Sequence, residues 1–333
     1  MTRLVQIKKG TVRRVALVEE PNLRVLDGYS SVYELATSAL KGDMKLSDLA
    51  HKRLTAERLN YNLVYDGRSE WRMLPPIDHP DEPSRCMISG TGLTHLGSAR
   101  DRDSMHAAPS NEMTDSMKMF HWGKDGGRPG KGEIGTPPEW FYKGTGTTLR
   151  AHGQPLDIPS YAEDGGEEAE IAGIYVIGPD GTPCRIGMAG GNEFSDHRFE
   201  KKNYLNLAGS KLRTCALGPE LVLDPEFSSV CVQVNIYRNE NVLWSGAFRT
   251  GEAEMCHSLR NLEHHHFKFE AHRRPGDLHV HFFGTDCLSF GAGILLQDRD
   301  VMEVAFEGYG RPLRNTVHAA ESAALLIEVS SLG

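Results

Sequence analysis

Two glutamates, Glu168 and Glu170, stand at the start of an apolar segment, Ile171–Ile177, that has the length and composition of a buried strand. Side chains two residues apart on an extended chain point to the same face. Carboxylates on one face repel each other unless a cation lies between them, and a hard divalent ion such as Mg²⁺ prefers such oxygen ligands. The pair is therefore either a metal site or, as is commoner for acidic clusters, a solvated strand entrance.

The next turn brings a third carboxylate toward the first two. The apolar segment ends in Gly178-Pro179-Asp180-Gly181, which is a turn signal, and the returning segment leads to Glu193. A hairpin of this length places Glu193 at the end of the pair where Glu168 and Glu170 lie. Three converging carboxylates are costly without a metal ion. Lys211 follows, and this lysine either neutralises the site, carries a proton if it is desolvated, or is an ordinary surface lysine.

Histidines offer further candidates. His95 lies among small residues in the segment 90–100, where it is a base, a fourth metal ligand or a hydrogen-bonded structural residue. The run His264–His266 would alternate between two faces of a strand, so we interpret it as an interface or surface feature. His279 and His281 share a face, and packing is the better interpretation. No cysteine lies beside a base in a motif that would activate a thiol nucleophile.

The chain that must position these residues divides near residue 80. Residues 1–80 are expected to form a small α+β domain that ends in a proline-rich segment, 73–80. Its expected strands are 4–7, 14–18 and 23–26, and its expected helices are 31–39 and 46–58.

Residues 81–333 are expected to form a mostly β catalytic domain. The clearest expected strands are 171–177, 221–223, 230–237 and 301–306, and the clearest helix is 251–261. Residues 100–138 are polar and glycine-rich and predict a long loop, which we interpret as a lid.

Composition excludes several classes of function. The chain has 333 residues with a formal net charge of −8 and a pI near 6.0, which disfavours a nucleic-acid partner. It has no run of 18 apolar residues and no signal-peptide pattern, so no membrane role is expected. Its six cysteines form no C-x-x-C pair. Reduced thiols in the cytoplasm are the simple interpretation.

Taken in order along the chain, several motifs together resemble the fumarylacetoacetase superfamily. These are the E-x-E at Glu168–Glu170, a G-N-E-x-S segment ending at Ser195, and a G-S-K segment ending at Lys211. Three more segments agree: Pro138–Gly144 as a P-x-x-F-x-K strand, Phe283-Gly284-Thr285, and the closing stretch Val301–Asn315. The resemblance covers roughly residues 85–317.

The resemblance implies a fold and a site. The fold would be a small N-terminal α+β domain followed by a mixed β-sandwich roll. The metal ligands would be Glu168, Glu170 and Glu193, binding Mg²⁺ or, in its place, Mn²⁺ or Ca²⁺. Lys211 would lie beside the metal. The remaining candidates are Lys143 and His95 for catalysis, and Ser195, Gly284 and Thr285 for the substrate. Two departures from the family pattern, Glu193 in place of an aspartate and the unusual segment 90–100, leave the general base open.

The subgroup that this long form resembles implies a magnesium-dependent dehydratase of pentose oxidation. It would convert a 2-keto-3-deoxy-pentonate, of the xylonate or arabinonate type, to 2-oxoglutarate semialdehyde. Two alternatives remain: a C–C bond hydrolase of acylpyruvates or 2,4-diketo acids, and an inactive binding paralogue. The expected partners are a small 2-keto acid and further copies of the chain in a homodimer or homotetramer.

Overall fold

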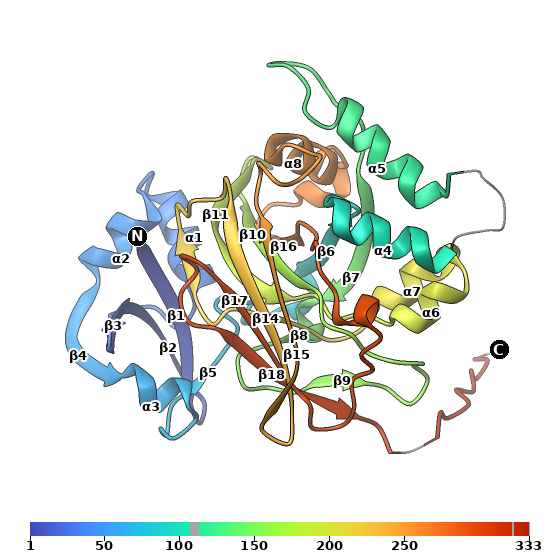
Figure 1. Cartoon of the computed structure of the whole chain (residues 1–333). Helices are drawn as coiled ribbons and strands as arrows, with labels where there is room; N and C mark the ends of the chain where they lie inside the picture. The colour runs from blue at the N-terminus through green and yellow to red at the C-terminus, as the bar shows by residue number, and fades with distance from the viewer. Residues whose placement is uncertain (107–112, 322, 333) are drawn as a thin grey trace.

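The N-terminal residues form an antiparallel meander of four strands. These are β1 (Thr2–Lys9), β2 (Val12–Glu19), β3 (Asn22–Leu26) and β4 (Leu54–Asn60). Helices α1 (Val32–Lys41) and α2 (Leu46–Lys52) cover one face, and α3 (Tyr61–Tyr65) packs on the other. The computed structural model describes residues 1–106, 113–321 and 323–332, and Figure 1 shows the whole arrangement.

The helix expected over residues 46–58 is wrong in its second half. It ends at Lys52, and Leu54–Asn60 is a strand that pairs with β3. The backbone groups along β3 need hydrogen-bond partners, and satisfying them outweighs the helix propensity of a short segment.

The meander does not end as a separate sheet at residue 80. β1 pairs with β13 (Leu221–Leu223), with Thr2 opposite Leu223 and Leu4 opposite Leu221. The main path of the large sheet is therefore β4-β3-β2-β1-β13-β11-β10-β16-β6-β7. Its remaining strands on this path are β11 (Pro183–Asn192), β10 (Ala169–Ile177), β16 (Leu278–Phe282), β6 (Cys86–Gly92) and β7 (Glu139–Thr145). Three short strands pair beside it, namely β5 (Arg72–Met73), β8 (Leu149–Arg150) and β12 (Cys215–Leu217).

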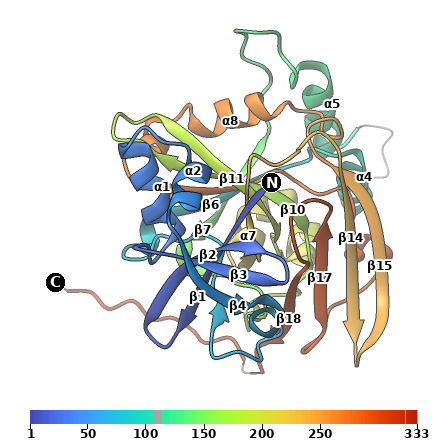
Figure 2. The same ribbon diagram turned by 90° about the vertical axis from the view of Figure 1, so that its left-hand side faces the viewer.

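A second sheet packs against the middle of the first. Its order is β15 (Asn241–Thr250), β14 (Val230–Arg238), β17 (Val301–Phe306), β18 (Leu313–Ala319) and β9 (Leu156–Ile158). Every residue of β10 is buried, because α1 and α2 lie over one face of the large sheet, and the second sheet together with Phe267 covers the other (Figure 2). The mostly β, α+β class is confirmed. Among the described residues, no helix is long and apolar enough to cross a membrane.

Residues 100–138 differ from the loop expected there. Helices α4 (Leu96–His106) and α5 (Asp115–Gly126) occupy much of this region, and residues 107–112 lie outside the described part of the chain. Ala99 and Phe120 pack with Leu93, so apolar contact stabilises helices whose own pattern is weak. The glycine-rich stretch after α5 is irregular, as predicted.

Two further expectations fail around residue 260. The helix expected over 251–261 begins only at α8 (Leu259–Phe267), where the Ser258 side chain accepts a hydrogen bond from the Asn261 backbone N–H. The run His264–His266 lies in this helix rather than on a strand, and His265 and His266 are buried. The other short helices are α6 (His197–Lys202), α7 (Leu207–Lys211) and the 3₁₀ turns Pro83–Arg85, Gly146–Thr148, Tyr204–Asn206, Glu270–Arg273 and Ser289–Ala292.

Candidate metal and substrate site

Three buried glutamates converge where the β10–β11 hairpin opens. Pairing of Ala169 with Asn192 brings Glu193 back beside the pair Glu168 and Glu170. The Glu193 backbone N–H donates to the Glu168 carbonyl oxygen at 2.8 Å. One carboxylate oxygen from each glutamate lies within 4.8 Å of the other two. An ion bound at about 2.4 Å reaches opposite ligands up to about 4.8 Å apart, so the three oxygens fit around one divalent ion.

Two buried lysines hold this cluster. The Lys211 ammonium, at the end of α7, lies 2.6 Å from Glu168 Oε1 and 2.5 Å from Glu193 Oε2. Lys143, on β7, lies 2.7 Å from Glu193 Oε1 and also donates to the carbonyl oxygen of Lys211 at 2.9 Å. Burial opposes the charge of Lys211, but Glu168 and Glu193 outweigh burial and raise its pKa. Lys211 is therefore an ammonium ion in this arrangement.

Glu170 is held by the backbone of the segment after β16. The Gly284 N–H donates to Glu170 Oε2 at 2.7 Å. Gly284 has φ +95°, and a Cβ there would lie 2.1 Å from the Thr94 hydroxyl oxygen, so this position requires glycine. Burial, together with the nearby charges of Glu168 and Glu193, raises the pKa of Glu170 well above its usual range. A bound cation would relieve this repulsion.

Residues just after β11 support the same carboxylates. The Ser195 hydroxyl donates to Glu193 Oε2 at 2.9 Å, and His197 Nε2 lies 3.0 Å from Glu168 Oε1. Burial alone would raise the pKa of Glu168. The Lys211 charge and the His197 hydrogen bond outweigh it and hold that pKa well below its usual range.

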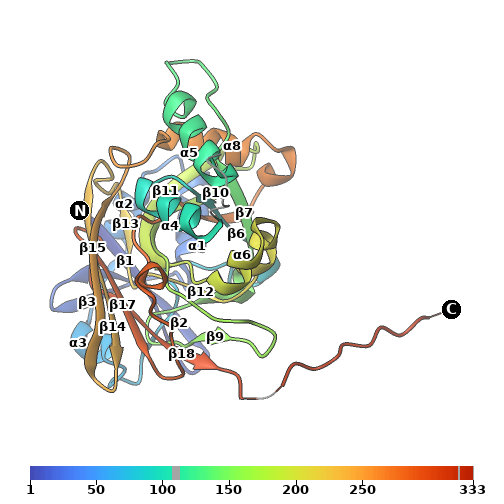
Figure 3. The same cartoon turned by 45° about the vertical axis from the view of Figure 1, so that its right-hand side comes forward.

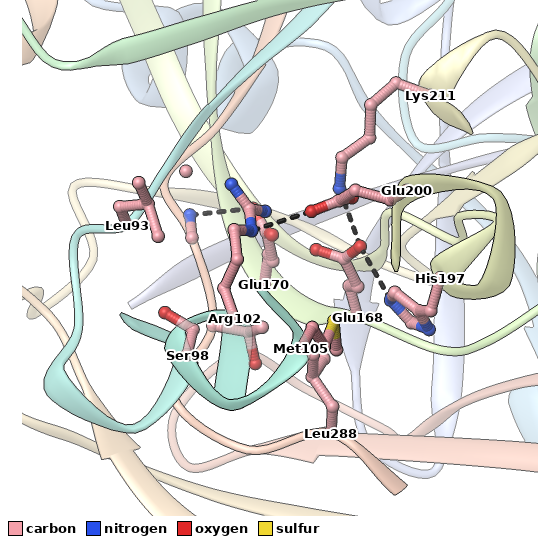
Figure 4. Close-up of a pocket in the computed structure, with 13 residues that line it drawn as sticks. Leu93, Ser98, Arg102, Met105, Glu168, Glu170, His197, Glu200, Lys211 and Leu288 are labelled. Carbon is pink, nitrogen blue, oxygen red and sulfur yellow. Dashed lines mark hydrogen bonds and ion pairs between the residues drawn. The ribbon is translucent and has the colours of Figure 1, made fainter. Parts of the chain in front are cut away.

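A small cavity lies beside the cluster (Figure 4). Its lining includes Glu168, Glu170 and Lys211 on one side and residues of α4, among them Arg102, on the other. The enclosed space is about 20 Å³, which holds roughly one water molecule. A substrate of five carbons therefore enters only if part of the lining moves aside. Helix α4 supplies part of that lining and is the element we expect to move.

Arg102 connects α4 to the opposite wall. Its Nη1 lies 2.8 Å from both carboxylate oxygens of Glu139 on β7, and its Nε lies 2.7 Å from Glu200 Oε1 on α6. The Tyr204 hydroxyl also donates to Glu139, at 2.9 Å. These groups are nearly buried, so the ion pairs are only weakly screened by water.

The structure places most of the sequence candidates around this centre. Lys211, Gly284 and Thr285 line the cavity together with two of the three glutamates. Lys143 and Ser195 lie behind Glu193, where they hold its carboxylate rather than face the cavity.

His95 does not line the cavity, and its ring is bound by two threonine hydroxyls. Its Nδ1 is 2.8 Å from the Thr94 hydroxyl and its Nε2 is 3.0 Å from the Thr250 hydroxyl. Burial lowers the pKa of His95 to about 3. The ring is a neutral structural group in this position, which argues against its expected role as a base.

Sequence reasoning missed four residues of the site. Glu139 lies inside the motif that singled out Lys143, and His197 follows two residues after Ser195. Arg102 and Glu200 belong to short helices that bring them together from 98 positions apart in the sequence. For Arg102, no local pattern signals the contact.

Comparisons with known proteins agree with this architecture. No protein-family model and no curated protein sequence matches the chain. Among solved structures, a 2-keto-3-deoxy-D-arabinonate dehydratase complexed with magnesium and 2,5-dioxopentanoate matches with a TM-score of 0.72. The identity is 18%, and the match covers 96% of this chain and 100% of that one. This chain has the fold of that dehydratase.

The same fold serves other chemistry. A 2-hydroxyhepta-2,4-diene-1,7-dioate isomerase from Mycobacterium marinum matches with a TM-score of 0.58 and 17% identity, covering 97% of this chain and 100% of that one. A dehydratase-type fold alone therefore does not select the reaction. That choice depends on the residues around the cavity.

Proposed function

We propose that the protein is a magnesium-dependent dehydratase of a 2-keto-3-deoxy-pentonate. The observation that carries the proposal is the set of three buried glutamate carboxylates within 4.8 Å of one another, two of them bridged by Lys211 at the wall of a small cavity. The dehydratase that shares the fold was solved with magnesium and 2,5-dioxopentanoate, which is 2-oxoglutarate semialdehyde.

The charges around the cavity favour a divalent ion. Five buried carboxylates meet there with three basic side chains. The carboxylates belong to Glu139, Glu168, Glu170, Glu193 and Glu200, and the basic groups to Arg102, Lys143 and Lys211. With every group ionised the cluster carries two negative charges in excess, and the raised pKa of Glu170 reflects how unfavourable that charge is without a further cation. One Mg²⁺, or Mn²⁺ or Ca²⁺ in its place, would neutralise it.

Glu168, Glu170 and Glu193 would hold that ion, and the carboxylate and keto oxygens of the substrate would bind to it. The ion, when bound, draws electron density from the keto carbon and favours loss of a C3 proton. Lys211 places a fixed positive charge at the wall where the keto oxygen would gain negative charge. Thr285 lines the same wall and offers a hydroxyl to the substrate.

Dehydration then needs a group that faces the C4 hydroxyl. The C3–H and C4–O bonds break, water leaves, and a shift of the new double bond toward C5 gives the aldehyde. Arg102 lines the cavity, with its guanidinium held by Glu139 and Glu200. Its positive charge would lie near the departing hydroxyl, and closure of α4 would keep bulk water out.

A second candidate is hydrolysis of a C–C bond in an acylpyruvate or 2,4-diketo acid. The same enolate would be its leaving group, and the fold also matches an isomerase of a longer dioic acid. The dehydratase matches this chain with the higher TM-score, 0.72 against 0.58 for the isomerase, which favours the pentonate substrate. An inactive binding paralogue is disfavoured, because burying five carboxylates and three basic groups together carries a large desolvation cost that a protein without this chemistry would not need.

The deciding experiment is a substrate panel. Purified protein with Mg²⁺ is incubated with 2-keto-3-deoxy-pentonates and with 2,4-diketo acids. The proposal expects 2-oxoglutarate semialdehyde from the first group and no pyruvate from the second. Pyruvate release without semialdehyde would replace the dehydratase by the hydrolase, and no turnover of either group would favour the paralogue. The proposal also assigns the protein to cytoplasmic pentose oxidation. A strain that lacks the protein is then expected to grow poorly on pentoses, and growth measurements test this.

A further inference from the structure

Loss of the C3 proton requires a base in the cavity. The base must face the substrate and hold a lone pair that is committed neither to the ion nor to a proton. His95 does not line the cavity. The described lining offers carboxylates, an imidazole, an ammonium, a guanidinium and hydroxyls, so the base is one of these groups.

The glutamates that would hold the ion are poor bases. Glu168 Oε1 lies 2.6 Å from the Lys211 ammonium and 3.0 Å from His197 Nε2. Glu170 Oε2 accepts the Gly284 N–H at 2.7 Å. The remaining lone pairs of both carboxylates would face the ion, and a nearby positive charge favours the ionised form of a carboxylate over the protonated one. Neither carboxylate is therefore expected to take a proton from carbon.

The imidazole and the ammonium of the lining are excluded as well. Burial lowers the pKa of Lys211, but Glu168 and Glu193 outweigh burial and raise that pKa, so the ammonium keeps its proton. His197 directs its Nε2 toward Glu168. Its Nδ1 lies against Gly166, where a Cβ would come within 2.3 Å of that nitrogen. Both ring nitrogens are thus turned to the protein rather than to the cavity.

The hydroxyls and the guanidinium cannot act alone. The Ser98 hydroxyl donates to the His95 carbonyl oxygen at 3.2 Å, and the Thr285 hydroxyl donates to the Cys287 carbonyl oxygen at 3.4 Å. A hydroxyl becomes reactive only when a neighbouring base activates it. Arg102 stays protonated in a protein and accepts no proton.

The lining carboxylate that remains belongs to Glu200, on α6. Glu200 is 2% exposed and lies outside the set of three described glutamates that fit around one ion. Arg102 Nε lies 2.7 Å from Glu200 Oε1. The Ser210 hydroxyl lies 3.5 Å from Oε2, at the limit of a hydrogen bond. The charge of Arg102 keeps Glu200 ionised and holds the carboxylate in one orientation.

The position of this carboxylate suits the C3 proton. Figure 3 shows α6 beside α4, and Figure 4 shows the Glu200 side chain directed toward Arg102 and Lys211. The negative charge of Glu200 also helps to raise the pKa of Lys211. The keto oxygen of the substrate would lie near Lys211, and C3 is bonded directly to the keto carbon. A group beside Lys211 is therefore within reach of a C3 proton.

Building on the proposed function, we propose that Glu200 is the general base that takes the C3 proton. The electron pair of the broken C–H bond becomes the C2–C3 double bond of the enolate. The C4–O bond then breaks, and the leaving hydroxyl takes the proton back from Glu200 and departs as water. Glu200 is ionised again at the end of each turnover, and no further reactant is needed.

Proton exchange tests this step separately from dehydration. 2-Oxopentanoate has the same carboxylate and keto group but no C4 hydroxyl, so it can lose and regain C3 protons without reacting further. With Mg²⁺ in D₂O, the protein is expected to exchange these protons for deuterium faster than Mg²⁺ alone does, as followed by proton NMR. Glu200→Gln is expected to slow the exchange on the order of 10²–10⁴-fold. The Mg²⁺-dependent rise in Tm should remain, because Glu200 is not a ligand.

Three further variants separate base loss from structural damage. Glu200→Asp keeps the charge beside Arg102 but sets the carboxylate back by one methylene, and it should slow the exchange at least tenfold. Glu139→Gln breaks the other ion pair of Arg102 and measures the cost of loosening α4 alone. That cost should be at least tenfold smaller than the loss in Glu200→Gln. Glu163→Gln, whose partner Lys202 is exposed, should exchange like the parent.

The outcomes distinguish the role of Glu200 from the proposed function. Near-parent exchange in Glu200→Gln or in Glu200→Asp would overturn the role of Glu200 alone. A larger loss in Glu139→Gln than in Glu200→Gln would do the same and would move the base to Glu139. A parent protein that exchanges no C3 proton would instead overturn the enolate chemistry, and the proposed function with it.

Discussion

Arg102 Nη1 lies 2.8 Å from both carboxylate oxygens of Glu139, and this contact joins α4 to β7 across the candidate site. The pair is nearly buried, so breaking it leaves a carboxylate without its cation in a poorly solvated place. The same guanidinium also meets Glu200 on α6. One side chain therefore holds three elements together over a cavity too small for the proposed substrate.

We expect Arg102→Met to loosen α4. Amide hydrogen exchange in residues 96–106 should speed up at least tenfold, because losing the ion pairs removes on the order of 2–4 kcal/mol that holds this helix in place. Turnover should fall as well. The matched control is Arg68→Met, whose partner Asp66 is exposed and whose loss should leave exchange in α4 unchanged. Unchanged protection in the Arg102 variant would show that α4 is held by packing alone.

The lid interpretation adds a ligand dependence to the same measurement. With a 2-keto acid and Mg²⁺ present, α4 and α5 should exchange more slowly than without them, because a closed site excludes water from its lining. Equal exchange in both states would count against a lid.

Metal binding should stabilise the fold measurably. At a Mg²⁺ concentration one hundred times Kd, the free energy of unfolding should rise by about 2.7 kcal/mol, seen as a higher Tm. Glu170→Gln should abolish this shift and turnover, since one ligand charge is lost. Glu263→Gln changes a buried glutamate that pairs with Arg185 elsewhere, and it should keep the Mg²⁺-dependent shift relative to its own metal-free Tm. A full shift in the Glu170 variant would remove it from the ligand set.

Lys211→Met should reduce turnover by about 10²–10⁴-fold, because a positioned charge beside the reacting oxygen is lost. The affinity for Mg²⁺ should change much less than turnover does. Calorimetric titration with Mg²⁺ measures that affinity separately. Lys211→Arg should restore little, since the larger guanidinium does not fit between two carboxylates 2.5 and 2.6 Å from the present nitrogen. Near-normal turnover of Lys211→Met would make the residue a structural one.

The buried histidines predict a loss of stability in acid. Burial and neighbouring imidazoles lower the pKa of His281 to about 3, below its ordinary value near 6.5. Between these values the unfolded chain binds a proton that the folded chain does not. The contribution of the neutral His281 ring to the free energy of unfolding is thus complete above pH 6.5. It is lost as pH falls toward 3, at about 1.4 kcal/mol per pH unit.

His281→Gln isolates this effect. Glutamine can keep hydrogen bonds to the hydroxyls of Ser89 and Thr91, each 2.8 Å from the ring, but it cannot be protonated. Urea unfolding should therefore lose about 1 kcal/mol less between pH 6 and pH 5 in this variant than in the parent chain. His51→Gln, at an exposed position, should follow the parent. Parallel pH profiles for parent and His281 variant would refute the assignment.

The cluster of three glutamates could be predicted because it depends on local geometry. The spacing of Glu168 and Glu170 and the turn before Glu193 place three side chains by strand periodicity and hairpin return alone. Lys211 followed from its motif. The large sheet could not be predicted in this way, since pairing of Thr2 with Leu223 has no local signal.

The missed features depend on contacts distant in sequence. α4 is a weakly amphipathic helix, and its Arg102 finds Glu139 only after β7 is in place. The run His264–His266 looked like part of a strand, although Ser258 and Asn261 carry the N-cap signal of a helix. His95 could be a base, a ligand or a structural residue from the sequence, and only the structure shows its two hydroxyl partners. Tertiary partners decided each of these cases.

The pairing of β1 with β13 has a consequence for synthesis on the ribosome. β2 follows β1 immediately and can pair with one side of it early, whereas β13 is translated more than two hundred residues later. β5 pairs with Ile7 and Lys8 earlier, but at 5–20 residues per second the Thr2–Leu4 part of that side waits roughly ten to forty seconds with open backbone groups. During this interval the nascent chain offers an unpaired strand edge to its neighbours on a polysome, so slow elongation or weak chaperone supply should lower the yield of native protein.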